Sequence, residues 1–245
     1  MSAAPSAPRR PLTPPEEVHA RLDEFRTRRG YINPQQGPLA AALPEVADAY
    51  RVIYKALVLD DKHLGPLEKE FVWLSLLCVA EEMGAHHLKL FFDLGGTDAQ
   101  ADAAFRIAAW VHGSRAYEYL DRQWQPYFSG VPARRAYQQA VDVLIAGLDG
   151  VPEDWCLLAL LCAHAGAKSK WGVEAALELC YERRIDEGRM AEAMSQALWP
   201  CGANALHDAA GVWLALIRSG RVNASPSFKA WAELPDQDGL VLAPR

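Results

Sequence analysis

The sequence predicts an all-α protein, and three observations carry this prediction. The chain has 245 residues, 51% of them hydrophobic and 23% charged, so it is long and apolar enough to bury a sizeable core. It contains 41 alanines but only 17 glycines, and alanine is the best helix former. Apolar residues recur at spacings of three and four in several segments, which is the helical period.

The first 60 residues predict an extension with two helices. The segment before Pro15 is rich in proline and lacks the apolar run of a secretory signal, so we expect it to be disordered. Apolar residues spaced by three and four then indicate a helix that ends near Gly30. Pro44 suits the first turn of a second helix, because proline has no amide hydrogen to lose there.

Two longer helices are predicted next. The continuous apolar middle of Pro66–Glu82 is too long for an average strand and indicates a buried helix. Thr97 is a suitable N-cap for a helix that we expect to run to about Leu120. A further helix is predicted to connect the two halves of the chain over residues 131–150.

An internal repeat is the most informative pattern in the sequence. The tripeptide Leu-Leu-Cys occurs at 76–78 and again at 160–162, and in the same register Glu70 aligns with Asp154. Further along, the alignment of the two copies shifts by five residues. In the shifted alignment, a tryptophan and a glycine of one copy match a tryptophan and a glycine of the other. The matches beyond the shift pair Trp110 with Trp199 and Gly113 with Gly202.

The repeat predicts how the chain is organised. We expect an N-terminal extension over 1–60, a first copy of the helical unit over 61–130 and a connecting helix over 131–150. The second copy would follow over 151–219, and a C-terminal tail over 220–245.

Charge and cysteine content exclude several classes of protein. The net charge of −6 and the pI of about 5.7 lack the basic excess that nucleic-acid binding requires. The apolar run Phe71–Ala80 is about half of the roughly 20 residues that a bilayer-spanning helix needs. Five cysteines without a Cys-x-x-Cys pair predict reduced thiols in a cytoplasmic protein without a structural zinc site.

Several of these residues resemble one family. The run Leu67-Glu68-Lys69-Glu70-Phe71, an apolar helix, His87 eight residues before Gly95, and the alanine-rich helix after Thr97 stand in this order. Together they resemble the carboxymuconolactone decarboxylase and alkylhydroperoxidase D superfamily. The resemblance implies an all-helical core unit, and covers both copies of the repeat.

The chain departs from the peroxidase branch of that superfamily. This branch carries Cys-x-x-Cys-x-x-x-His, but Ala80 and Met83 stand at the two cysteine positions before His87. Because peroxide reduction of this type needs a nucleophilic and a resolving thiol, the departure disfavours it. The decarboxylase branch, as the resemblance implies, acts on small carboxylated or lactone substrates without a metal or an organic cofactor.

The segment from Glu81 to His87 contains the predicted acid/base residues. If it is helical, Glu82 and His86 share one face at a spacing of four and can hydrogen bond. We expect His87 to shuttle a proton, assisted by Glu82 or by Glu70. The alternative is a solvated helix end with one buried histidine, and a carboxylate at position 70 that only complements the helix dipole. No metal site is expected, because the Glu-x-x-His pattern of di-iron bundles has no second copy.

The segment from His164 to Trp171 contains the predicted substrate-binding residues. A basic side chain such as Lys168 or Lys170 could bind a substrate carboxylate, with His164 and Trp171 beside it. The alternative is a solvated turn, since these lysines stand beside Ser169 and close to glycine.

The sequence therefore predicts a cofactor-independent lyase, decarboxylase or isomerase that acts on a small carboxylate or lactone. Two alternatives stay open: a thiol-dependent hydroperoxide reductase that uses Cys78 or Cys201, and a non-catalytic protein that binds a ligand or partner. The resemblance also implies a homo-oligomer, in which three duplicated chains would imitate six single units.

Overall fold

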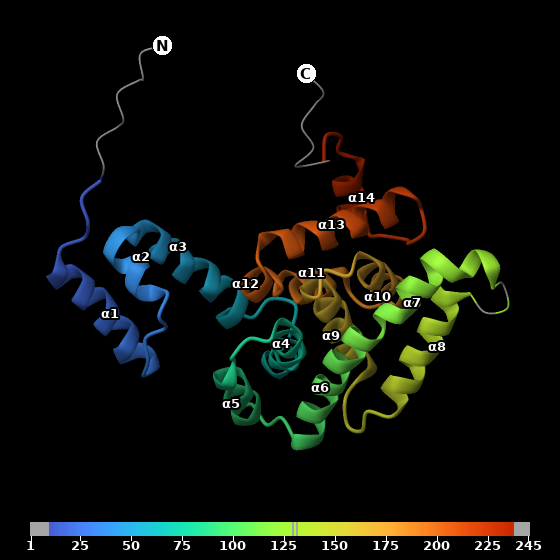
Figure 1. Ribbon diagram of the computed structural model, residues 1–245, viewed down its shortest axis with the longest axis horizontal. Coiled ribbons are helices and arrows are strands. Elements are labelled where there is room, and N and C mark those ends of the chain that lie inside the picture. Colours follow the sequence, from blue (N-terminus) through green and yellow to red (C-terminus); the bar gives the residue numbers. More distant parts are fainter. Residues whose placement is uncertain (1–9, 129, 131, 238–245) are drawn as a thin grey trace, which may run out of the picture. The chain divides into compact units, whose positions relative to one another are not determined.

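The computed structural model describes residues 10–128, 130 and 132–237. In these residues the fold is all-helical and contains no strand, which confirms the predicted class (Figure 1). The chain divides into two compact units, Met1–Asp60 and Asp61–Arg245. The predicted disordered lead-in lies mostly outside the described residues.

The N-terminal unit is a small group of helices held by ion pairs. Its first helix ends where predicted, because Gly30 takes up a left-handed backbone (φ 81°) that only glycine adopts at low cost. Arg21 lies 3.1 Å from Asp48, and Arg51 lies 3.2 Å from Glu24, so that two ion pairs join the first and third helices. The elements are α1 (Pro15–Arg29), the unpredicted α2 (Gln36–Ala42), α3 (Pro44–Tyr54) and the π-helical turn η1 (Lys55–Leu59).

The second unit is a helical bundle built around two apolar helices. Helices α4 and α9 pack against each other along their lengths, α6 packs against both, and α10, α11 and α13 pack against α9. Helix α5 packs on α4, and α14 packs on α13. The helices are α4 (Pro66–Ala80), α5 (Ala85–Asp93), α6 (Asp98–Gly113), α7 (Arg115–Tyr119), α8 (Ala133–Ala146), α9 (Glu153–Gly166), α10 (Lys170–Glu182), α11 (Glu187–Ser195), α12 (Leu198–Cys201), α13 (Ala203–Arg218) and α14 (Pro226–Glu233), with the short turns η2 (Leu120–Trp124) and η3 (Gln125–Tyr127) after α7.

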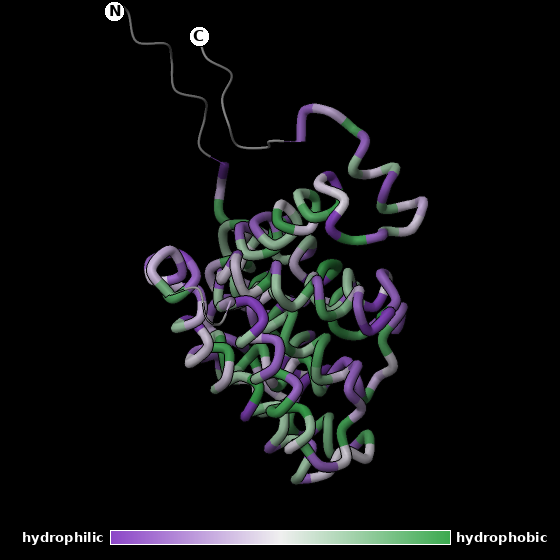
Figure 2. Tube along the Cα trace, turned by 90° about the vertical axis from the view of Figure 1, so that its right-hand side faces the viewer, coloured by the Kyte–Doolittle hydropathy of each residue, from purple (hydrophilic) through white to green (hydrophobic). Residues whose placement is uncertain are grey.

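The central position of α4 and α9 follows from their composition. Both helices are apolar on nearly every side, which is typical of a helix surrounded by other helices. Tryptophan, phenylalanine and leucine side chains of α4 are fully buried, and leucines and alanines of α9 fill the space opposite. Colouring by hydropathy shows apolar stretches within the packed helices and many hydrophilic positions on their outer turns (Figure 2).

Helices α4 and α6 end earlier than the sequence predicts, and part of the predicted tail is helical. Helix α4 ends at Ala80, two residues before the predicted end. Helix α6 ends at Gly113 rather than near Leu120, because Ser114 bonds through its hydroxyl to the carbonyl of Val111 (3.0 Å) and glycine is a poor helix former. Part of the predicted C-terminal tail forms α14, which begins at Pro226.

Among the described residues, no helix combines the length and the apolar character needed to cross a bilayer.

Candidate active site

The first two turns of α4 bury three consecutive ionisable residues. Glu68, Lys69 and Glu70 are all buried, although charged side chains seldom lie in a protein interior without partners. Pro66 occupies the first helical position, and the side chain of Glu68 accepts a hydrogen bond from the backbone N–H of Gly65 (3.3 Å), which stabilises the start of the helix. The three side chains have different partners. Two of them form ion pairs that hold helices together, and the third contacts a histidine.

Glu68 and Lys69 take part in structural ion pairs. The guanidinium of Arg189 bonds to Glu68, and bonds to Asp154 at 2.7 Å. The Nζ atom of Lys69 lies 3.5 Å from the Oε1 atom of Glu192, with both side chains almost fully buried. The other carboxylate oxygen of Glu192 accepts the backbone N–H groups of residues 63 and 64. These contacts tie the loop before α4 to α11.

Glu70 has a different kind of partner. Its Oε2 atom lies 2.7 Å from Nδ1 of His87, and the two side chains are 2% and 3% exposed. The pair joins the second turn of α4 to the first turn of α5. A carboxylate at Nδ1 holds the proton on that nitrogen, so Nε2 is the nitrogen that can accept or donate a proton.

Two aromatic rings surround the histidine of this pair. The indole of Trp73 stacks on the His87 imidazole, with 4.8 Å between ring centroids and an interplanar angle of 19°. The ring of His86 contacts it from another direction, at 4.3 Å. The Nε1 atom of Trp73 is buried and has no hydrogen-bond partner among the described residues. The imidazole is therefore fixed in position by one hydrogen bond and two ring contacts.

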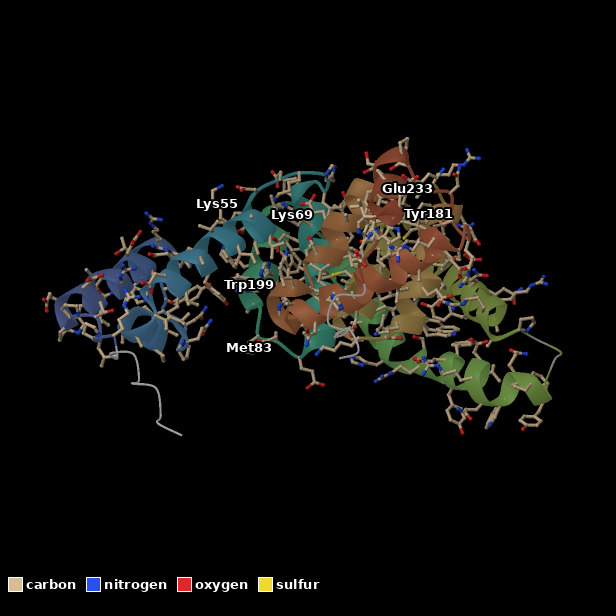
Figure 3. All side chains as sticks on the ribbon, turned by 90° about the horizontal axis from the view of Figure 1, so that it is seen from above. Lys55, Lys69, Met83, Tyr181, Trp199 and Glu233 are labelled. Atoms are coloured by element: carbon tan, nitrogen blue, oxygen red, sulfur yellow. The ribbon has the colours of Figure 1, made fainter. Side chains whose placement is uncertain are left out.

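The structure differs from the prediction that Glu82 and His86 share a helix face. Residues 81–84 form a turn between α4 and α5, because Glu81 adopts a left-handed backbone (φ 55°) that ends α4. Glu82 is exposed in this turn, and the neighbouring Met83 side chain is 94% exposed (Figure 3). His86 is exposed and His87 is buried. Of the two carboxylates considered as partners of His87, Glu70 makes the contact.

Two of the predicted substrate-binding residues lie in an aromatic cluster of the core. His164 is buried and its Nε2 atom lies 2.7 Å from the hydroxyl of Tyr137. Burial lowers the pKa of His164 to about 3. Trp171 packs edge-on against Tyr137, donates its Nε1–H to Asp121 (2.7 Å) and carries the guanidinium of Arg134 over its ring. These contacts give both residues a role in packing.

The two predicted lysines are exposed and lie apart from that cluster. Lys170 forms an ion pair with Asp208 on α13 at 3.0 Å. Lys168 has a left-handed backbone (φ 54°) in the turn between α9 and α10, where its charge acts on Cys201. The charge of Glu82 also acts on Cys201, so the turns after α4 and α9 approach the same thiol. Lys168 and Lys170 line one small pocket, so the structure divides the predicted substrate-binding residues between two places.

Most of the cysteines are poorly suited to redox chemistry. Cys156 and Cys180 are buried, and burial raises the pKa of each thiol to about 12. Burial also raises the pKa of Cys162 and of Cys201. Cys201 is the last residue of the short α12. Cys78 is exposed on α4.

Sequence reasoning assigned no role in the site to Trp73, Lys69 or Glu192. The signal for the buried ion pair was present, because three charged residues in succession at the start of an apolar helix require buried partners. The role of Trp73 depends on the turn that brings α5 back beside α4.

In the part of the chain that the structure describes, no group of three or more His, Cys, Asp or Glu side chains could hold a metal ion. Compared with known proteins, the chain matches no family model, no curated protein and no solved structure.

Proposed function

We propose that the protein is a cofactor-independent lyase, decarboxylase or isomerase that acts on a small carboxylate or lactone, with His87 as its general acid/base. The observation that supports this best is the 2.7 Å contact between Nδ1 of His87 and the Glu70 carboxylate, with both groups buried. Solvated histidines at helix ends do not have this arrangement. The substrate class follows from the sequence resemblance to the carboxymuconolactone decarboxylase superfamily.

The proposed chemistry uses the free nitrogen of the imidazole. In an isomerisation, Nε2 of His87 takes a proton from a carbon next to a carbonyl group while a double bond shifts, and returns it to the far end of that double bond. In a decarboxylation, the bond between the carbon and the carboxylate breaks, CO2 leaves, and the His87 imidazolium gives its proton to that carbon. Glu70 keeps Nδ1 protonated and stabilises the imidazolium that forms between the two steps. Trp73 prevents the ring from turning away from this carboxylate. Glu70 and Trp73 are positioning residues in this scheme, and His87 is the residue that touches the substrate.

The burial of His87 limits which substrates can reach its imidazole. Only 3% of His87 is exposed, so a substrate must reach the imidazole through this small exposed part or through a movement of the neighbouring turn. In the adjacent turn, residues 81–83 are exposed. A small substrate fits this geometry better than a polymer, which could not reach a buried ring.

The first prediction is that His87→Gln removes turnover and preserves the fold. Glutamine keeps a polar group of similar length but cannot exchange protons near neutral pH, so kcat/KM should fall by roughly 10²–10⁴-fold on whichever small carboxylate or lactone proves active. Glu70→Gln should lower kcat more than it changes KM, and should move the pH profile, because the imidazolium loses its counter-charge. Both effects are measured by steady-state kinetics on substrates found in a screen of small lactones and carboxylates.

The matched control is His112→Gln, which makes the same substitution at an exposed histidine near the end of α6. Its kinetics should equal those of the unmodified chain, and all three variants should keep the same far-ultraviolet circular dichroism. Undiminished turnover of His87→Gln, or an equal loss in His112→Gln, would exclude His87 as the acid/base group.

The same resemblance supports two further parts of this proposal. A homo-oligomer, and specifically a trimer that imitates six single units, is what a duplicated chain of this superfamily would form. A cytoplasmic location fits five cysteines without a paired motif.

A further inference from the structure

An open groove of about 900 Å³ lies along the outer face of α13, apart from Glu70 and His87. This volume is within the range of about 300–1,000 Å³ typical of small-molecule sites. Its floor contains small and apolar residues of one helix face, among them Gly211, Leu214 and Ala215. Because Gly211 has no side chain and open space above it, a flat molecule can lie close to the helix there.

Hydrogen bonds hold one wall of the groove in place. Arg218 donates from Nε to the carbonyl of Ala232 (2.9 Å) and from Nη2 to that of Leu234 (2.6 Å). The side-chain amide of Gln237 donates to the carbonyls of Trp231 and Leu234, at 2.7 and 2.8 Å. The segment after α14 is thereby fastened to the end of α13. The indole of Trp231, which packs edge-on against a core tryptophan, forms part of this wall.

The charges in the groove are not balanced at its two ends. At the start of α13, Lys170 is neutralised by Asp208 at 3.0 Å. At the other end, Arg218 forms no ion pair with a carboxylate among the described residues, and its Nη1 has no partner there. The guanidinium of Arg218 is held by two backbone carbonyls through Nε and Nη2. Its remaining nitrogen, Nη1, can therefore donate a hydrogen bond to the carboxylate of a ligand. Among the described residues, the groove therefore combines an apolar floor, an aromatic wall and one cation, Arg218, without a carboxylate partner.

We propose that this groove binds an aromatic carboxylate. The ring lies on Gly211 and Ala215 against the indole of Trp231, and the carboxylate lies at Arg218 beside Gln237. The site is separate from Glu70 and His87, so it can be occupied whether or not these residues are catalytic.

The test is titration calorimetry of the full chain with two probes of the same shape. 1-Naphthoate should bind with a Kd below 1 mM, and the neutral 1-naphthalenemethanol should bind at least tenfold more weakly because it lacks the charge. Gly211→Leu should weaken naphthoate binding at least tenfold by filling the floor. A side chain at this position meets no atom within 4 Å, so the variant should fold normally.

The matched control is Gly113→Leu, which adds the same side chain to another exposed helical glycine that has open space around it. It should leave naphthoate binding unchanged. The proposal is overturned if the unmodified chain does not bind naphthoate below 1 mM, if the neutral alcohol binds equally well, or if Gly211→Leu binds naphthoate as tightly as Gly113→Leu.

Discussion

At the scale of single residues, His164 is a group that folding keeps neutral. Its pKa falls to about 3, first because burial disfavours the charged imidazolium and second because of the nearby charge of Arg134. The unfolded chain binds this proton near pH 6.5, so between pH 6.5 and 3 the unfolded state carries more protons than the folded state. The contribution of His164 to stability is therefore complete above pH 6.5 and falls as the pH falls towards 3.

This gives a second prediction, for the free energy of unfolding between pH 7 and pH 5. At about 1.4 kcal/mol per pH unit below 6.5, His164 should make the unmodified chain lose about 2 kcal/mol more than His164→Gln over this range. Urea denaturation at each pH measures the difference. His207→Gln removes an exposed histidine and should keep the pH dependence of the unmodified chain; equal pH dependence in His164→Gln would show that His164 is not held neutral.

At the scale of elements, the turn after α4 determines which residues of α4 and α5 meet in the candidate site. Glu81 ends the helix with φ 55° and ψ 34°, and the N–H of Glu82 bonds to the carbonyl of Leu77 at 3.0 Å. This left-handed residue costs roughly 1–2 kcal/mol for any side chain except glycine. It also directs the chain back, so that His87 lies beside Glu70.

The third prediction follows from this backbone conformation. Glu81→Gly should raise the free energy of unfolding by about 1 kcal/mol, because glycine adopts the left-handed region without that cost. Glu82→Gly is the matched control, since residue 82 does not have a positive φ and should gain nothing. Denaturant unfolding of both variants checks the difference, and an equal change in the two would contradict the assignment of strain to Glu81.

The start of α4 could be predicted from the sequence, but its end at this turn could not. Proline at position 66 and a continuous apolar run predict the start and the burial of α4, because both signals are local. The end of the helix is not marked, since a glutamate in a left-handed conformation has no sequence signature. Spacing along the chain therefore favoured Glu82 as a partner of His86. The contact of Glu70 with His87 joins residues 17 positions apart, and it depends on the path of the turn between them.

Contacts between distant helices are harder to predict from the sequence pattern than the fold class is. The all-α class follows from composition and periodicity, and it is confirmed. The pairing of Lys69 with Glu192 and the groove along α13 depend on how distant helices pack. The repeat, which rests on matched residues, stays a prediction of the sequence.

At the scale of the whole molecule, the two units differ in how much apolar surface they bury. In the described part of Met1–Asp60 the buried hydrophobic residues are Phe25, Ala40, Ala47 and Val58, and most ion pairs there are exposed. Exposed ion pairs contribute little to stability. A unit of this size with such a small core is at the lower limit for independent folding. Asp61–Arg245 contains the packed helices α4 and α9, and both residues of the Glu70–His87 pair.

The fourth prediction is that the fragment 61–245 folds by itself and the fragment 1–60 does not. Burial of apolar surface stabilises a fold in proportion to its area, and this area is concentrated in the second unit. Fragment 61–245 should unfold in one cooperative urea transition, with a midpoint close to that of the main transition of the full chain. Fragment 1–60 should show a gradual change without a midpoint.

Circular dichroism during urea titration of both fragments distinguishes these outcomes. The absence of a cooperative transition in 61–245 would mean that the extension is part of the same folding unit. Because Glu70 and His87 both belong to 61–245, a folded fragment should also keep the hydrogen bond between them, detectable as a downfield-shifted Nδ1 proton in its NMR spectrum.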